Sequence, residues 1–96
     1  MTIQGGCAYI VTNKYNTVLY TGVAASVSNR VRQHRDKFYP KSFTARYNVA
    51  KLVYYESFGT IEEAIAREKQ IKGYSRVKKI QLIRRKNPEW KDLFEE

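Results

Sequence analysis

Two short runs rich in β-branched and aromatic residues place the strongest constraint on how this chain can fold. The first run spans residues 7–12 and the second spans 17–22. Each run predicts a β-strand, and the polar residues 13–16 between them predict an antiparallel hairpin. If that loop is symmetric, Tyr9 lies opposite Tyr20, and both phenols point to one face of the sheet. The two tyrosines then form either a simple packing contact or part of a functional site.

The length of 96 residues predicts one domain with a modest hydrophobic core. No apolar run approaches the roughly 18 residues that a membrane span requires. The first residues also lack the basic and apolar segments of a signal peptide. Cys7 is the single cysteine, so an internal disulfide is excluded and a reducing compartment fits. We therefore expect a cytoplasmic protein that does not enter a membrane.

The balance of charge points to a partner. Lysine and arginine number 18 against 9 acidic residues, which gives a formal net charge of +9. Such an excess on a small domain is the usual electrostatic footprint of a nucleic-acid binder. The alternative is charge that only maintains solubility, which usually lies between about 2 and 8 for a small domain. The charge favours nucleic acid as the partner.

An amphipathic helix is predicted over residues 26–38. Four residues recur there at helical spacing, namely Val27, Val31, His34 and Phe38. His34 therefore lies inside the apolar stripe of the helix. A histidine in this position is either a hydrogen-bonded core residue or a catalytic group.

Residues 39–47 are predicted to form a basic loop that bears aromatic side chains, with Pro40 ending the helix before it. Interleaved basic and aromatic residues suit the neutralisation of phosphates together with base stacking. They equally suit a loop that tucks its aromatic side chains under a helix. The sequence leaves both interpretations open.

A third strand and two further helices are predicted in the second half of the chain. Apolar residues fall on both faces of 48–58, which indicates the central or best-covered strand of the sheet. A capping box begins the next helix, with Thr60 and Glu63 each satisfying the other's backbone amide. That helix should end at Gly73 as a C-terminal glycine cap. The last helix is predicted over 76–86.

Glu68 falls at the centre of the apolar face of the helix that ends at Gly73. A carboxylate in such a place is costly to bury unless something pairs with it. One interpretation is an ion pair with Lys72, four residues later. The other is a divalent cation, because a hard, partly hydrated ion needs only one or two carboxylates in addition to phosphate oxygens.

The end of the chain is predicted to fold back. Beyond Pro88, three large apolar residues recur at helical spacing, namely Trp90, Leu93 and Phe94. The predicted organisation is a single domain over 1–96, with a core at about 7–87 and a tail, 88–96, that docks back onto it.

Five residues, taken in their order along the chain, resemble the pattern of the GIY-YIG nuclease family: Tyr9, Tyr20, Arg30, His34 and Glu68. The resemblance covers the chain from residue 7 to about 87, and it is strongest to the small stand-alone, YhbQ-like branch. Cys7-Ala8-Tyr9 stands in the place of the first motif and keeps its tyrosine, while Tyr20-Thr21-Gly22 stands in the place of the second. The resemblance implies an α+β fold with a small three-stranded antiparallel sheet flanked by helices.

The resemblance also implies cleavage of a phosphodiester with one divalent metal ion, Mg²⁺ or Mn²⁺. Carried over by position, Tyr9 would be the general base, and His34 would accept or relay its proton. Tyr20 would orient the phosphate or water, Arg30 would bind the scissile phosphate, and Glu68 would hold the metal. A phenol has a pKa near 10, so this role requires nearby cations to lower the pKa of Tyr9.

The expected function is that of a metal-dependent endonuclease acting on nucleic acid, DNA in the first place, in repair or recombination. One alternative is a nucleic-acid-binding module on a decayed nuclease scaffold, and another is an interaction domain whose protein partner adds substrate choice. The intact set of five site residues argues against decay. The residues expected to bind nucleic acid are Arg30, Arg35, Lys41, Arg46, Lys72, Arg76, Lys78 and Lys79.

Overall fold

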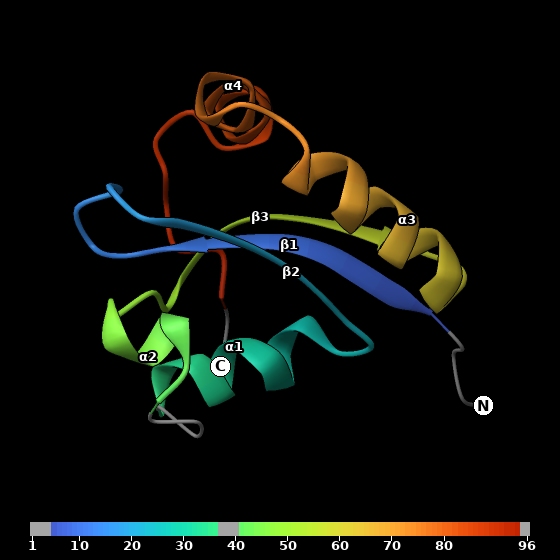
Figure 1. The fold of residues 1–96 in the computed structure, drawn as a ribbon, viewed down its shortest axis with the longest axis horizontal. Coiled ribbons are helices and arrows are strands. Elements are labelled where there is room, and N and C mark those ends of the chain that lie inside the picture. Colours follow the sequence, from blue (N-terminus) through green and yellow to red (C-terminus); the bar gives the residue numbers. More distant parts are fainter. Residues whose placement is uncertain (1–4, 37–40, 95–96) are drawn as a thin grey trace.

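The computed structural model describes residues 5–36 and 41–94, which form a three-stranded antiparallel sheet between two layers of helices (Figure 1). The elements are β1 (Gly6–Thr12), β2 (Leu19–Ala24), α1 (Val27–Arg35), α2 (Phe43–Arg46), β3 (Lys51–Phe58), α3 (Ile61–Lys72) and α4 (Arg76–Lys86). Helices α1 and α2 cover one face of the sheet, and α3 and α4 cover the other. The predicted α+β class is confirmed. Within the described ranges, the helices are too short or too polar to cross a membrane.

The central strand of the sheet is β1, because the strand order is β2-β1-β3. The prediction that the third strand is central was therefore wrong. A shift of register opposite Ile10 and Val11 gives β3 an extra residue, Val53. As a result, Val53 and its neighbour Tyr54 are both buried in the same hydrophobic cluster. This bulge, and not a central position, explains why apolar residues follow one another in β3.

The register of the hairpin differs by two residues from the symmetric loop that the sequence suggested. Tyr9 pairs with Gly22, and Tyr20 pairs with Val11. The cause lies in the loop, where the side-chain Oδ1 of Asn13 accepts two backbone amides, at 2.8 and 3.2 Å, in the second half of the turn. Because strand side chains alternate with a period of two, both tyrosines still face the same side, in a diagonal arrangement.

Side chains of β1 alternate between two hydrophobic clusters, one on each face. Ala8 and Ile10 belong to the cluster under α3 and α4, which also contains Ile71, Leu82 and Ile83. Tyr9 and Val11 belong to the cluster under α1, together with Val31, Val49 and Leu52. Alternation along one strand therefore decides which residues build the site on the α1 side.

The helices begin where their cap residues predict. Ser26, Thr60 and Ser75 each accept the backbone amide three residues later. Glu63, however, accepts a bond from the hydroxyl of Thr60, at 3.0 Å, so only half of the expected capping box forms. Gly73 caps α3 with a φ of −77°, so its position does not use the left-handed conformation that glycine allows.

The segment predicted as a loop over 39–47 contains the short helix α2. Ser42 caps this helix by accepting the amide of Ala45 at 3.3 Å. The prediction of a loop was therefore wrong for 43–46. Residues Phe38 and Pro40, on which the predicted end of the preceding helix rested, lie outside the described residues.

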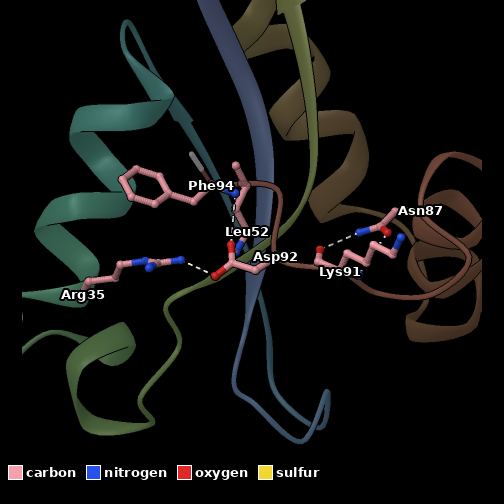
Figure 2. A network of polar contacts seen from close by, with 6 residues as sticks. All are labelled: Arg35, Leu52, Asn87, Lys91, Asp92 and Phe94. Carbon is pink, nitrogen blue, oxygen red and sulfur yellow. Dashed lines mark hydrogen bonds and ion pairs between the residues drawn. The ribbon is translucent and has the colours of Figure 1, made fainter. Parts of the chain in front are cut away.

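The C-terminal segment runs across β3 after α4 ends (Figure 2). The buried amide of Asn87 donates to the backbone carbonyls of Val53 and Lys91, at 3.0 and 2.9 Å. The backbone amide of Leu93 then donates to the carbonyl of Leu52 at 2.8 Å. These bonds cover part of the edge of β3, which would otherwise offer unpaired backbone groups.

Asp92 connects the C-terminal segment to α1. One carboxylate oxygen accepts the amide of Leu52 at 3.3 Å, and the other forms an ion pair with Arg35 (Figure 2). The guanidinium of Arg35 also lies over the ring of Phe94, 4.4 Å from its centroid. The C-terminal segment thus connects β3 to α1.

Candidate active site

Tyr9 occupies the centre of the candidate site. Its side chain is fully buried, and its hydroxyl lies 3.1 Å from Nε2 of His34. Gly22, its partner in β2, has no side chain to collide with the phenol. A Cβ at position 22 would lie only 2.5 Å from the Tyr9 hydroxyl. The glycine of the second motif is therefore required so that the phenol can lie across β2.

His34 joins Tyr9 to two hydroxyl groups that the sequence analysis did not identify. Its Nδ1 lies 2.8 Å from Oγ1 of Thr44, which in turn lies 3.2 Å from Oγ of Ser42. Thr44 is 4% exposed, so its hydroxyl has little access to solvent. No local pattern marks Thr44, because the short helix α2 brings it to His34 only through tertiary packing.

A cavity of about 160 Å³ adjoins this row of hydrogen bonds. Its walls are Tyr20, Arg30, Gln33, His34, Ser42, Phe43 and Thr44. The ring of Tyr20 stands edge-on to His34, with centroids 5.9 Å apart. Arg30 is exposed to solvent and contributes its cation to the wall. Three of the five predicted site residues, Tyr20, Arg30 and His34, thus line one cavity. Tyr9 lies behind this lining and contacts His34.

The pKa values of Tyr9 and His34 do not follow the expectation that nearby cations lower the pKa of the phenol. Burial and the neighbouring Tyr20 raise the pKa of Tyr9 to about 12, although Arg30 opposes this shift. The prediction that cations lower this pKa is therefore wrong for the protein by itself. Burial, with help from Arg30, also lowers the pKa of His34 below 6.5. At neutral pH the phenol keeps its proton and the imidazole is uncharged.

Glu68 approaches from the opposite layer, on α3. It is 9% exposed, and its carboxylate lies 2.9 Å from Nζ of Lys72. The hydrogen bond to Glu68 raises the pKa of Lys72. The ion pair that the sequence suggested is therefore present. The charge of Glu68 also makes the smallest of the contributions that raise the pKa of Tyr9.

The donor set around Glu68 fits only a partly hydrated metal ion. Within 5–36 and 41–94, no cluster of three acidic, histidine or cysteine side chains could hold a metal. Mg²⁺ and Mn²⁺ need only one or two carboxylates when water and phosphate oxygens complete the shell. The half-exposed Lys72 can swing away from Glu68, so one carboxylate can be made available.

The residues expected to bind nucleic acid do not form one surface. Arg30 on α1 and Arg46 on α2 lie on one side of the sheet, and Lys41 shortly precedes α2, whereas α4 carries its cations on the other side (Figure 1). Two of the eight are already engaged in ion pairs, namely Arg35 with Asp92 and Lys72 with Glu68.

The cations of α4 have neighbours of their own. Arg76 donates to the backbone carbonyl of Thr17 at 2.8 Å, and the ammonium of Lys78 lies 4.2 Å from the ring centroid of Tyr74. Lys79 is partly buried on the same helix. The candidate site and the basic helix α4 are therefore separate features of the surface.

Comparisons with known proteins agree with this arrangement. The family model of the GIY-YIG catalytic domain matches residues 5–81. A UPF0213 protein of Staphylococcus saprophyticus is 41% identical over 75 residues, which are 78% of this chain and 89% of that protein. A UPF0213 protein of Syntrophus aciditrophicus is 37% identical over 71 residues, which are 74% and 80% of the two chains.

A solved structure supports the same assignment. The solution NMR structure of a UPF0213 protein from Bacillus halodurans aligns with a TM-score of 0.58 and 28% identity, and the alignment covers 93% of both chains. The family model spans most of the chain and includes all five predicted site residues. The chain therefore belongs to the GIY-YIG family of nuclease domains.

Proposed function

We propose that this chain is a divalent-metal-dependent endonuclease that hydrolyses phosphodiester bonds in DNA. The observation that supports it most directly is the contact between the Tyr9 hydroxyl and Nε2 of His34, 3.1 Å apart, beside a cavity that Arg30 also lines. The proposal includes a role in repair or recombination, a location in the cytoplasm and a protein partner that adds substrate choice.

The proposed proton path uses Tyr9 and His34 together. Because the pKa of Tyr9 is about 12, the phenol alone is a poor base at neutral pH. An uncharged His34 that donates Nδ1–H to Thr44 keeps a free lone pair on Nε2. When an attacking water gives its proton to the Tyr9 oxygen, the phenol's own proton passes to Nε2. The water oxygen then bonds to phosphorus, and the leaving oxygen departs.

Arg30 and Tyr20 have supporting roles in this scheme. Both line the cavity, where a scissile phosphate would meet the guanidinium of Arg30. Arginine suits this role because its planar fork of N–H groups matches phosphate oxygens. Tyr20 stands edge-on to His34 and would orient the phosphate or the water. Positioning and charge neutralisation contribute most of the catalysis in phosphoryl transfer.

Glu68 would hold the metal ion, Mg²⁺ or Mn²⁺, with water and phosphate oxygens as the other ligands. When bound there, a divalent ion neutralises charge on the phosphate and makes a water easier to deprotonate. In the free protein, Lys72 pairs with Glu68 and balances the charge of its carboxylate.

The ion pair between Glu68 and Lys72 also favours a second candidate function. If Lys72 occupies the carboxylate permanently, the chain is a nucleic-acid-binding module with the shape of a nuclease. The two candidates differ in whether the wild type cuts DNA, and a substitution of Glu68 then shows whether its carboxylate holds the metal.

The substitution Glu68→Gln keeps the size of the side chain and removes its charge. We expect it to abolish cleavage and the rise in melting temperature that Mn²⁺ causes, because a ligand stabilises only by binding the folded state. The free energy of unfolding without metal should change by less than about 1 kcal/mol, as for a partly exposed ion pair. The readouts are cleavage of a panel of DNA substrates and thermal melts with and without Mn²⁺.

Glu56→Gln is the matched control, since Glu56 also pairs with a cation, Arg67, at 3.1 Å. It should cost stability and leave both cleavage and the response to Mn²⁺ intact. A Glu68→Gln protein that still cuts DNA and still responds to Mn²⁺ would contradict the role of Glu68 as the metal ligand. A wild type that binds DNA but cuts no member of the panel would favour the binding module.

A further inference from the structure

Three aromatic side chains form a continuous row that starts at the candidate active site. Tyr20 stacks on Phe43 with centroids 6.1 Å apart and ring planes at 27°. Phe43 in turn contacts Tyr47, the residue directly after α2, with centroids 4.7 Å apart. Phe43 is 47% exposed and Tyr47 is 46% exposed. This aromatic row therefore presents its outer members to solvent and does not tuck them under a helix.

The row ends at a second cavity, of about 330 Å³, between the hairpin loop and the end of α2. Its lining residues are Asn13, Lys14, Tyr15, Tyr47 and Asn48. Tyr15 is 71% exposed, the most exposed of the large hydrophobic residues described. Phe43 lines the active-site cavity and Tyr47 lines the second, so the aromatic row connects the two.

The segments of the chain that contribute the aromatic row and the second cavity carry positive charge only. The chain contains no aspartate or glutamate in residues 1–35 or 37–55, which include the hairpin loop and α2. The ammonium of Lys14 lies 5.0 Å from the ring centroid of Tyr15, and the guanidinium of Arg46 lies 5.8 Å from that of Tyr47. Both aromatic side chains at the second cavity are thus paired with a cation.

The exposed aromatic rings and the cations beside them match single-stranded nucleic acid better than any other ligand. Cations that follow a backbone, next to exposed aromatic faces, are the features by which proteins hold single-stranded nucleic acid. Each unpaired base offers a face for stacking, whereas a duplex keeps those faces covered by neighbouring base pairs. An exposed aromatic surface on a small domain also marks an interaction site.

We propose that the aromatic row and the second cavity bind unpaired bases of a nucleic-acid strand. The strand enters the active-site cavity at Arg30, and its next bases stack on Phe43 and Tyr47, with Tyr15 at the far end. This proposal rests on the proposed function for the position of the scissile phosphate. It adds the substrate class, which is single-stranded nucleic acid.

The test measures binding in the absence of metal, so that cleavage plays no part. The probe is a short fluorescently labelled DNA strand of mixed sequence, used either alone or annealed to its complement, and the readout is fluorescence anisotropy. The variants are Tyr47→Ala, which removes the ring, and Tyr47→Phe, which keeps it. Tyr55→Ala is the matched control, because Tyr55 is 43% exposed but lies on β3, outside the row.

The expected result is that the wild type binds the single strand more tightly than the duplex. Tyr47→Ala should weaken single-strand binding about ten-fold and barely affect duplex binding, as for the loss of one stacked base. Tyr47→Phe and Tyr55→Ala should bind like the wild type, and thermal melts should show all the variants folded. Equal binding of both probes, or equal losses for both in Tyr47→Ala, would overturn the proposal.

The binding experiment with Tyr47→Ala and the cleavage experiment with Glu68→Gln test the two proposals separately. If Glu68→Gln still cuts while Tyr47→Ala loses single-strand binding, the base-binding surface holds and the metal site fails. If Glu68→Gln abolishes cleavage while Tyr47→Ala binds normally, the nuclease assignment holds and the base-binding surface is overturned.

Discussion

Two buried tyrosines on neighbouring strands, Tyr9 and Tyr54, have very different surroundings. Tyr54 donates to the carboxylate of Glu56 at 2.6 Å, and Arg67 donates to that same carboxylate at 3.1 Å. The hydroxyl of Tyr9 lies 3.1 Å from Nε2 of an uncharged imidazole, that of His34, and Arg30 acts on it more weakly than burial does. Tyr54 therefore belongs to a balanced ion pair on the α3 side. Tyr9 belongs to a chain of hydroxyl and imidazole groups beside a cavity.

The difference distinguishes a structural cluster from the cluster that we propose to be reactive. In the Tyr54 cluster, the negative charge of Glu56 is matched by Arg67, so no group there is free to exchange a proton near neutral pH. In the Tyr9 cluster, hydroxyl and imidazole groups can donate or accept in turn, and the nearby cation of Arg30 forms no ion pair with the described residues. A proton relay requires the second kind of environment.

The strongest test of this contrast is to remove each hydroxyl in turn. Tyr9→Phe should reduce cleavage by about 100-fold or more, because it interrupts the proton path, while nucleic-acid binding persists. Tyr54→Phe should leave cleavage unchanged and cost about 2 kcal/mol of stability, as for a hydrogen bond to a charged group. Single-turnover cleavage and urea denaturation measure the two effects. Equal losses of activity in both variants would erase the distinction.

A smaller effect is expected at Thr44, which contacts Nδ1 of His34 at 2.8 Å. Thr44→Val keeps the shape and removes the hydroxyl, so the imidazole loses the partner that fixes its tautomer. Cleavage should slow by about ten-fold, the equivalent of about 1.4 kcal/mol. Thr44→Ser restores the hydroxyl and should recover most of the rate. A serine variant as slow as the valine variant would assign Thr44 to packing alone.

The smallest expected effect is a difference in how pH affects stability. Because the pKa of His34 is below 6.5 in the fold, the unfolded chain binds more protons just below that pH. The free energy of unfolding should therefore fall as the pH drops through 6.5, by at most about 1.4 kcal/mol per unit. Urea denaturation from about pH 7.5 to about 5.5 measures the slope, and His34→Gln should flatten it.

The Tyr54 cluster should respond in a different range. Burial works to raise the pKa of Glu56, but the bonds from Tyr54 and Arg67 outweigh it and hold that pKa below 4.5. Its contribution to stability is present above 4.5 and is lost only as the pH falls below that value. If Glu56→Gln changes the slope near pH 6.5 as much as His34→Gln does, the two clusters are not independent.

Local features of this protein followed from the sequence because they depend on near neighbours along the chain. Ser26, Thr60 and Ser75 cap the helices that the pattern predicted, since an N-cap bond spans only three residues. The ion pair between Glu68 and Lys72 was one of two interpretations for the same reason. The alternation along β1 and β2 also placed Tyr9 and Tyr20 on one face even though the predicted register was wrong.

The tertiary structure decided everything that depends on distant segments meeting. The strand order placed β1 and not β3 at the centre of the sheet, and α2 brought Thr44 to His34. Packing on both sides of β1 buried the Tyr9 phenol deeply enough that desolvation outweighed the charge of Arg30. Spacing along the chain identifies which residues can share a face, but a pKa depends on the solvent that the completed fold excludes, and no local pattern contains that information.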